Sequence, residues 1–176
     1  MMERRRFERI YTDHYEAVLR YCLRRSSRED ALDAAAETFT VAWRRRDEFP
    51  ADRSLPWLYG VARRVLANQR RSAGRRRSAI APLRVVGDDG PEPQVVRDFE
   101  AEEVVGALQR LRSADRELIA LAAWEGLSRD EIAVAMDCTP NAVTKRLNRA
   151  LDRLARELGT AGRAGGRFFG REEASG

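Results

Sequence analysis

The spacing of the apolar residues constrains this chain most, because it follows a helical period almost everywhere. In two blocks, residues 7–77 and residues 101–158, apolar side chains recur every three to four residues. This spacing places them on one face of each helix. No run of β-branched residues alternates as a half-buried strand would. The pattern predicts an all-α protein made of two small helical domains.

The stretch between the blocks breaks the helical period. Its segment 81–94 (APLRVVGDDGPEPQ) holds three prolines, two glycines and three acidic residues. Proline and glycine interrupt helices, and the acids keep the chain solvated. We therefore expect domains at 1–77 and 101–158, a flexible linker at 78–100, and a disordered glycine-rich tail at 159–176.

Capping signals divide the first block into three helices. Ser27, with Asp30 three residues later, predicts the start of the second helix. Pro50 predicts its end, because proline disfavours helix at the preceding residue. Ser54 is then expected to cap a third helix that tolerates Pro56 in its first turn.

Similar signals divide the second block. Ser113 predicts the start of a helix that stops near Gly126, a residue suited to the position after a helix. Thr139 followed by Pro140 predicts the start of a long helix, because proline is well tolerated at the first helical position. Gly159 is expected to end that helix.

The segment from residue 128 to residue 154 is typical of a helix-turn-helix. Ser128 and Glu131 form a capping-box pair, Ala133 is small where two helices would cross, and Asp137 stands where the chain must reverse. Aspartate tolerates the left-handed conformation better than most residues. The outer face of the second helix carries Asn141, Thr144, Lys145, Asn148 and Arg149.

These outer residues have the chemistry that reads DNA. Amides can bond adenine, while arginine and lysine bond guanine and phosphate. The second helix of such a motif enters the major groove. The alternative is a plain helical hairpin whose polar face is only solvated.

Charge is unevenly distributed along the chain. The whole sequence has 33 Lys and Arg against 28 Asp and Glu, a net charge of +5. Residues 1–77 alone hold 19 arginines and 11 acidic residues, a net charge of +8. This excess indicates a polyanionic partner for the N-terminal domain. The alternative is a solvated arginine-rich face.

Several function classes are disfavoured. His14 is the single histidine, so no Ser/His/Asp or Cys/His catalytic set can be assembled. Cys22 and Cys138 lie far apart and suit neither a disulfide framework nor a metal site. The N-terminus lacks an apolar signal segment, and no run approaches the roughly 18 apolar residues of a membrane span. We expect a cytoplasmic protein that is not an enzyme and holds no metal or cofactor.

Residues 7–158 resemble the extracytoplasmic-function sigma factors. The segment 33–44 (DAAAETFTVAWR) is similar to a helix of that family's second region, whose usual pattern is an acid, two bulky apolar residues and Gln-Glu-Thr-Phe. Three alanines here stand where larger residues are common. In the family this helix docks on a coiled coil of the polymerase's largest subunit.

That resemblance assigns roles to single residues of the helix. It implies that Asp33, Glu37 and Thr38 face core RNA polymerase, while Phe39 and Trp43 pack inward.

The segment 57–64 (WLYGVARR) resembles the next helix of the same region, with Arg64 in place of a frequent asparagine. In the family this part reads the promoter's −10 element. The preceding loop, 47–56, is rich in hydrogen-bonding groups, and we expect it to hold an extruded base on which Phe49 or Trp57 stacks. Alternatively, Phe49 only fills the core. The residues expected to bind the −10 element are Arg53, Trp57, Arg63, Arg64, Asn68, Arg70 and Arg71.

The second block resembles the family's fourth region, whose helix-turn-helix binds the −35 element. The resemblance thus implies an alternative sigma factor that binds core RNA polymerase and directs promoter recognition, DNA melting and transcription initiation. An anti-sigma factor is a common partner in the family. Two other classes stay open: a stand-alone helix-turn-helix regulator, and a polymerase-binding antagonist without promoter specificity.

Overall fold

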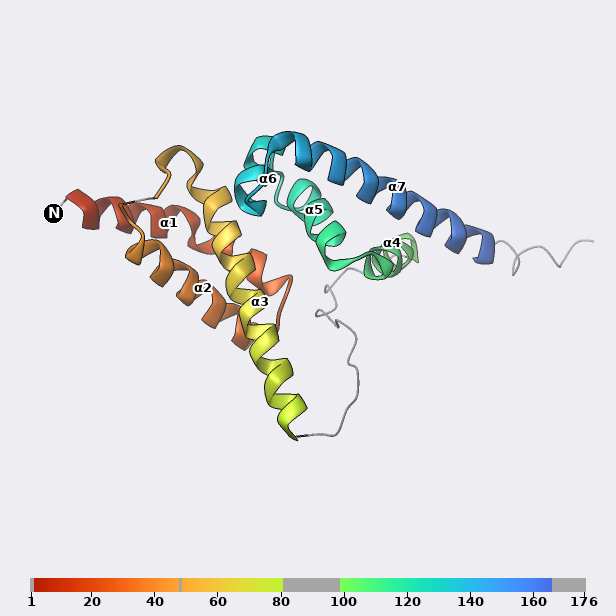
Figure 1. Ribbon diagram of the computed structural model, residues 1–176, viewed down its shortest axis with the longest axis horizontal. Coiled ribbons are helices and arrows are strands. Elements are labelled where there is room, and N and C mark those ends of the chain that lie inside the picture. The colour runs from red at the N-terminus through yellow and green to blue at the C-terminus, as the bar shows by residue number, and fades with distance from the viewer. Residues whose placement is uncertain (1, 48, 81–98, 166–176) are drawn as a thin grey trace, which may run out of the picture. The chain divides into compact units, whose positions relative to one another are not determined.

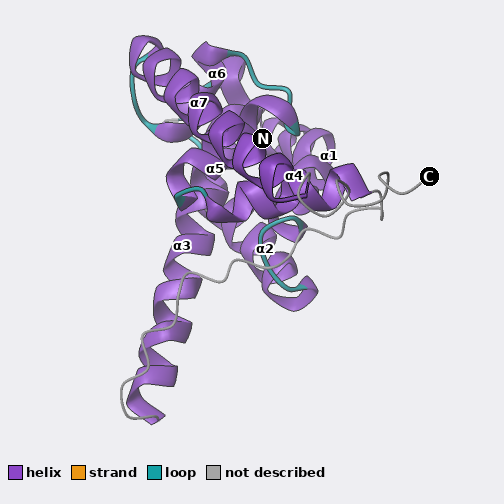
Figure 2. Cartoon of the chain, turned by 90° about the vertical axis from the view of Figure 1, so that its right-hand side faces the viewer, coloured by secondary structure: helices purple, strands orange, loops and turns teal. Residues whose placement is uncertain are grey.

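The computed structural model describes residues 2–47, 49–80 and 99–165, and these residues form helices joined by short loops (Figures 1 and 2). None of the described residues forms a strand, so the all-α prediction is confirmed. The elements are α1 (Met2–Leu23), α2 (Arg28–Arg44), the 3-10 helix η1 (Ala51–Arg53), α3 (Ser54–Ile80), α4 (Phe99–Arg110), α5 (Ser113–Ala123), α6 (Arg129–Met136) and α7 (Pro140–Gly165).

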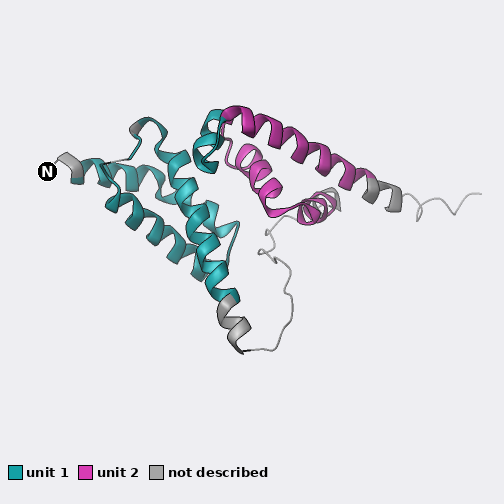
Figure 3. Ribbon diagram, in the orientation of Figure 1, with its two compact units in different colours: residues 1–93, 130–139 teal, residues 94–129, 140–176 magenta. Residues whose placement is uncertain are grey.

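The chain divides into two compact units (Figure 3). Unit 1 holds residues 1–93 and 130–139, and unit 2 holds residues 94–129 and 140–176. Helices α1, α2, α3 and α6 therefore belong to unit 1, and α4, α5 and α7 to unit 2. Most of the predicted linker and the end of the predicted tail lie outside the described residues, so the domain boundaries stay a prediction.

The core of unit 1 lies where α1, α2 and α3 pack on one another. Val18 of α1, Phe39 of α2 and Leu58 of α3 are all buried there. The rings of Tyr21 and Tyr59 stack at a centroid distance of 4.9 Å and join α1 to α3. Full burial of one such large apolar side chain stabilises the fold by about 1.5–3 kcal/mol.

The start of α2 is as predicted, and the start of α3 is not. The backbone N–H of Asp30 donates to the Ser27 hydroxyl at 3.2 Å, which confirms Ser27 as the N-cap. Ser54 was expected to cap α3, but it is itself helical, with φ −55° and ψ −55°. Its hydroxyl donates to the Pro50 carbonyl instead. The reason is the preceding 3-10 turn, η1, which already leads the chain into α3. Pro56 lies in the first turn, as predicted.

Unit 2 is built around α7, which packs on α4 and α5. Two ion pairs add to this packing: Arg110 of α4 bonds Glu157 at 2.7 Å, and Arg153 bonds Asp115 of α5. The apolar cluster between the helices consists of Leu108, Leu111, Ile119 and Ala150, with Leu147 and Leu154 packed against it.

The helix ends of the second block agree only partly with expectation. Gly126 follows α5 with a φ of +66°, the left-handed conformation that glycine adopts easily, and α7 begins at Pro140; both predictions are confirmed. Ser113 does not cap α5, because Arg112 takes the N-cap position with an extended backbone. Gly159 does not end α7, which continues to Gly165. One helical glycine costs about 1 kcal/mol relative to alanine, which a helix already several turns long can sustain.

Candidate nucleic-acid and protein interfaces

Helix α2 presents an acidic outer face. Asp33 and Glu37 are exposed and lie one helical turn apart. Thr38, which was predicted to share this face, is fully buried, and its hydroxyl donates to the Ala34 carbonyl at 2.7 Å. That prediction is wrong because the helical turn places Thr38 directly after Ala34 on the buried side. A partner can therefore reach Asp33 and Glu37, but not Thr38.

The two aromatic residues of α2 behave differently. Phe39 is buried, as predicted, with 3% of its surface exposed. Trp43 packs inward only in part: its ring meets Phe7 edge-on at 5.0 Å, yet 39% of the residue is exposed. Two of the three unusual alanines are buried and the third, Ala36, is exposed. The two buried alanines occupy less volume in the core than larger residues would. The exposed Ala36 is an apolar residue on the outer face of α2.

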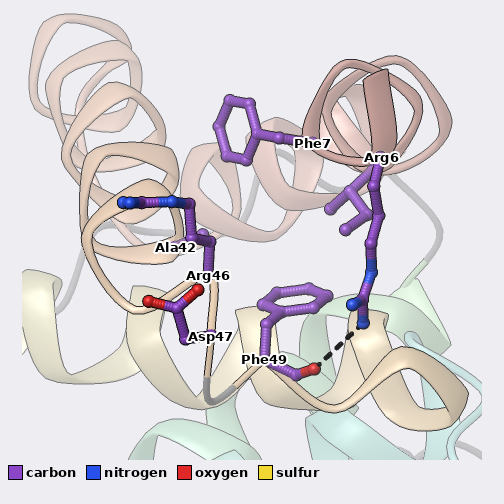
Figure 4. A pocket seen from close by; sticks show the side chains of 7 residues that line it. Arg6, Phe7, Ala42, Arg46, Asp47 and Phe49 are labelled. Carbon is purple, nitrogen blue, oxygen red and sulfur yellow. Dashed lines mark hydrogen bonds between the residues drawn. The ribbon is translucent and has the colours of Figure 1, made fainter. Parts of the chain in front are cut away.

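A cavity of about 280 Å³ lies beside the loop between α2 and α3 (Figure 4). Phe49 is buried and meets Trp57 edge-on at 5.0 Å, so it fills the core and forms a cavity wall at once. Nη2 of Arg6 donates to the Phe49 carbonyl at 3.2 Å. The lining residues are Arg6, Phe7, Ile10, Ala42, Arg46, Asp47 and Phe49.

The sequence indicated the loop but missed the side of the cavity that α1 supplies. Arg6 and Phe7 are separated from Phe49 by more than forty residues, and no local pattern links them. The only signal available was the basic N-terminus, which does not single out Arg6 from its arginine neighbours.

The structure separates the predicted −10 residues of α3 into two faces. Trp57, Arg64, Asn68 and Arg71 follow one another at intervals of seven, four and three residues, so they share a face, here called the α3 strip. Trp57 is half-buried and the other three are exposed. Within the strip, Arg71 donates to the Asn68 side-chain oxygen, so these two side chains are held together.

Three predicted residues lie outside the α3 strip. Arg70 donates to the carbonyl of Arg25 at 2.8 Å and so ties α3 to the turn between α1 and α2. Arg63 lies seven residues before Arg70, on the same face, and is half-buried. Arg53 is exposed at the end of η1. The structure therefore does not gather all seven predicted residues on one surface.

The segment that follows α6 makes a tight backbone turn. Asp137 has a φ of +53°, which confirms the left-handed conformation expected of it. The backbone N–H of Cys138 donates to the carbonyl of Ala133 at 3.0 Å and closes the end of α6. Helix α7 begins at Pro140, three residues after Asp137.

The predicted reading residues occupy the first turns of α7. Asn141, Lys145 and Asn148 are exposed and lie on one face, with Arg149 exposed beside them. Nε of Arg149 donates to the Lys145 carbonyl at 3.2 Å. Thr144 is half-buried, and its hydroxyl donates to the Pro140 carbonyl at 3.1 Å. Of the predicted residues, two amides and two cations are therefore exposed on α7. The Thr144 hydroxyl is already hydrogen-bonded within the helix.

None of the described helices is long and apolar enough to cross a membrane. Within the same residues, no group of three or more His, Cys, Asp or Glu side chains is placed to hold a metal ion.

Polar helix faces together with a helix-turn-helix segment are typical of DNA-binding transcription proteins. The family models agree in detail. Residues 10–76 match "Sigma-70 region 2" and residues 101–154 match "Sigma-70, region 4".

Alignments with known sigma factors extend over most of this chain. The chain is 33% identical to the ECF RNA polymerase sigma factor SigD of Mycobacterium tuberculosis over 157 residues, covering 82% of this chain and 73% of SigD. It is 31% identical to the sigma factor NccH of Alcaligenes xylosoxydans xylosoxydans, with 71% of each chain covered.

Solved structures share the fold. The sigma factor RpoE of Bartonella quintana, in complex with the anti-sigma factor NepR, matches with a TM-score of 0.63, 24% identity and coverage of 86% of this chain and 96% of RpoE. CnrH, in complex with the cytosolic domain of CnrY, matches with a TM-score of 0.56, 24% identity and 88% coverage of both chains.

The chain belongs to the extracytoplasmic-function sigma factors. It is an alternative sigma factor that partners core RNA polymerase and directs promoter recognition and transcription initiation. Sigma factors are regulatory DNA-binding proteins rather than catalysts.

Proposed function

We propose that helices α1 to α3 melt the −10 element and hold it as single-stranded DNA, with one extruded base in the cavity beside the loop. The cavity carries this proposal. It has apolar walls from Phe7 and Phe49, and the charged residues Arg6, Arg46 and Asp47 also line it. A base with its attached phosphate has a matching combination of flat apolar surface and negative charge.

The α3 strip suits the strand that continues from such a base. Arg64 and Arg71 can bind successive phosphates, and Asn68 can bond a base edge. Extruding a base costs a few kcal/mol, and stacking on an aromatic ring returns about 1–3 kcal/mol per base. Trp57 contributes by holding the Phe49 ring in place through an edge-on contact, with a centroid distance of 5.0 Å.

Open-complex formation tests this proposal. Holoenzymes carrying Arg6→Ala or Asn68→Ala are compared with wild type on an intact promoter and on one pre-melted at the −10 element. Arg5→Ala is the matched control, since Arg5 is an exposed neighbour that does not line the cavity. We expect sequence-dependent defects on both templates for the first two variants. Wild-type behaviour of both variants on both templates would overturn the proposal.

We further propose that the outer face of α7 reads the −35 element in the major groove. The support is the tight turn at Asp137 together with the exposed Asn141, Lys145 and Asn148. Footprints of the holoenzyme on promoter DNA test this. Protection of the −35 element that survives removal of residues 101–158 would contradict it.

Docking on the polymerase is proposed for the outer face of α2, through Asp33 and Glu37. Their exposure supports it, and Thr38 is no longer included because it is buried. Co-purification of core enzyme with a variant in which both charges are reversed tests this proposal.

Segment 78–100 is proposed to act as a spacer between the promoter-binding parts. Residues 78–80 and 99–100 belong to α3 and α4. The 18 residues between these helices can extend over at most about 59–65 Å. Replacing residues 84–94 by glycine and serine at equal length should preserve DNA reading but change initiation efficiency. Protection of these residues from protease in the free protein would contradict a flexible spacer.

Inside the cell, we propose that an anti-sigma factor holds this chain away from polymerase. RpoE, which shares the fold, was solved with the anti-sigma factor NepR. The chain's site of action is accordingly the cytoplasm, where polymerase works. Capture of one specific inhibitory protein from cells that contain the native gene neighbourhood, competitive with core polymerase, tests this. The proposal would be contradicted if none of the captured proteins competes with core polymerase for binding to this chain.

A further inference from the structure

We propose that helix α6 covers one end of the α3 strip in the free chain, through a close contact at Gly60, and that it leaves before the −10 strand binds there. The contact is autoinhibitory, because it blocks a DNA-binding face until the chain joins core polymerase. The inference rests on the proposed role of the α3 strip in holding single-stranded DNA.

Helix α6 belongs to one part of the molecule by sequence and to another by its contacts. It lies within residues 101–154, which match the family's region 4. Its contacts nevertheless group residues 130–139 with helices α1 to α3 in unit 1 (Figure 3). A helix of region 4 is thus packed as part of the unit that carries the α3 strip.

Gly60 of α3 lies against the backbone of α6. A Cβ atom added at Gly60 would lie 2.9 Å from the carbonyl oxygen of Ala135 and 3.3 Å from its Cα. Carbon atoms that are not bonded pack at about 3.5–4.0 Å, so a side chain at position 60 would force the two helices apart. Gly60 is buried, and only 1% of Ala135 is exposed. The missing side chain of Gly60 therefore allows this close approach.

The contact falls on the face of α3 that carries the strip. Gly60 follows Trp57 by three residues and precedes Arg64 by four, so all three lie on one helix face. Helix α6 therefore occupies the end of the strip near Trp57, whereas Asn68 and Arg71 are exposed. A DNA strand bound along the whole strip would need the space that α6 fills at Gly60.

The length of the promoter also requires this contact to break. The −10 and −35 elements are about 25 base pairs apart, which is about 85 Å at 3.4 Å per base pair. Arg149 of α7 is 14 residues from Ala135, a stretch that spans at most about 50 Å. Asn68 lies about 12 Å from Gly60 along α3. While Gly60 touches Ala135, the α3 strip and the reading residues of α7 cannot lie on both elements at once.

The experiment measures how the whole chain, without polymerase, binds a labelled single strand that carries the −10 element of a promoter the holoenzyme transcribes. The test variant is Gly60→Ala. The matched control is Gly74→Ala, because Gly74 also lies in α3 and an added Cβ there meets nothing within 4 Å. Both substitutions favour the helix alike, so the two variants differ only in the contact with α6.

We expect Gly60→Ala to bind the strand about 10-fold more tightly than wild type, because a competent state populated at about 10% weakens apparent affinity by that factor. Gly74→Ala should differ from wild type by less than about twofold, since it leaves the population of the closed state unchanged. In holoenzyme the difference between the two variants should disappear, because polymerase has already released α6. Circular dichroism reports whether each variant is folded.

A second variant approaches the same contact from α6. Ala135→Leu enlarges the residue that faces Gly60 and should also raise strand binding by the free chain. The double variant should bind no more tightly than either single variant, because both substitutions remove one and the same contact. Additive gains would show that the two positions act independently and would overturn the inference.

The remaining outcomes separate this inference from the −10 assignment. If Gly60→Ala and Ala135→Leu bind like Gly74→Ala while Asn68→Ala weakens binding, the autoinhibitory contact is overturned and the role of the α3 strip stands. If Asn68→Ala is also without effect, the role of the α3 strip fails as well. Weaker binding by Gly60→Ala, both free and in holoenzyme, would show that position 60 touches the DNA and would overturn the inference.

Discussion

The outer faces of α2 and α7 are built on the same plan and differ in chemistry. Both helices bury an apolar side, Phe39 in α2 and Val143 in α7. Outward, α2 presents Asp33 and Glu37 beside an exposed leucine, whereas α7 presents amides and cations. The inner faces hold each helix in its unit, and we propose that the outer faces select its partner.

The difference shows how a chain with a single sign of net charge can serve two kinds of partner. Under the proposed roles, the acids of α2 would repel nucleic acid from that face, and the cations of α7 would attract it. Variants of the two faces should accordingly separate polymerase binding from DNA binding.

The largest effect is expected on the free energy of unfolding, from a substitution on the buried face of α2. Phe39→Ala removes a side chain that is 3% exposed and should destabilise the protein by about 3–5 kcal/mol. Ala36→Ser, at an exposed position of the same helix, should change stability by less than about 0.5 kcal/mol. Denaturant unfolding measures both. Equal stability of the two variants would show that the inner and outer faces of α2 are wrongly assigned.

Charge reversal on the outer face of α2 should have the next largest effect. Asp33→Lys with Glu37→Lys should weaken core polymerase binding by at least about 100-fold, because two attractive contacts become repulsive. Helicity should be unchanged, since both residues are exposed. The control reverses Asp13 and Glu16, exposed acids of α1. Normal co-purification of the α2 variant with core enzyme would refute docking through this face.

On α7, loss of a base contact should be smaller and confined to one base pair. Asn148→Ala, if this amide reads a base edge, should relax preference at one position of the −35 element by about 1–3 kcal/mol. Holoenzyme binding to a panel of single-base promoter variants measures it. A uniform loss across the panel would assign Asn148 to the DNA backbone instead.

The smallest effect belongs to a backbone contact. Lys145→Ala should weaken binding to all sequences alike and lower the salt slope of the binding constant by about one. Lys145→Arg, which keeps the charge, should leave the slope unchanged. A titration with salt distinguishes the two, and an unchanged slope in Lys145→Ala would place this residue away from the phosphates.

Features governed by neighbouring residues could be predicted from the sequence. The Ser27 cap bonds a residue three positions away, Asp137 takes a conformation that its own side chain tolerates, and Pro140 starts a helix with a φ that its ring already fixes. Each depends on a few adjacent residues, so the pattern that encodes it is short.

Features governed by competition or by distant packing could not be predicted. Ser54 is a good capping residue, but the preceding 3-10 turn begins the helix first. Thr38 is polar and follows a glutamate, yet it lies one helical turn after Ala34 and is buried with it in the packed unit. Arg6 lines the cavity and donates to the carbonyl of Phe49, which is 43 residues away in the sequence. No local sequence pattern predicts a contact over that separation.

The exposed position of Lys145 on α7 has a practical consequence, because it is the only lysine among 176 residues. Succinimidyl esters react with amines, and the Lys145 side chain is the only side-chain amine in the sequence. The N-terminal amine is the other group that they can modify. A lysine-specific endoprotease has one bond to cut, between Lys145 and Arg146, in the middle of the helix face that presents the amides. The rate of that single cleavage therefore reports, without any introduced label, how often α7 opens and how strongly a bound duplex shields it.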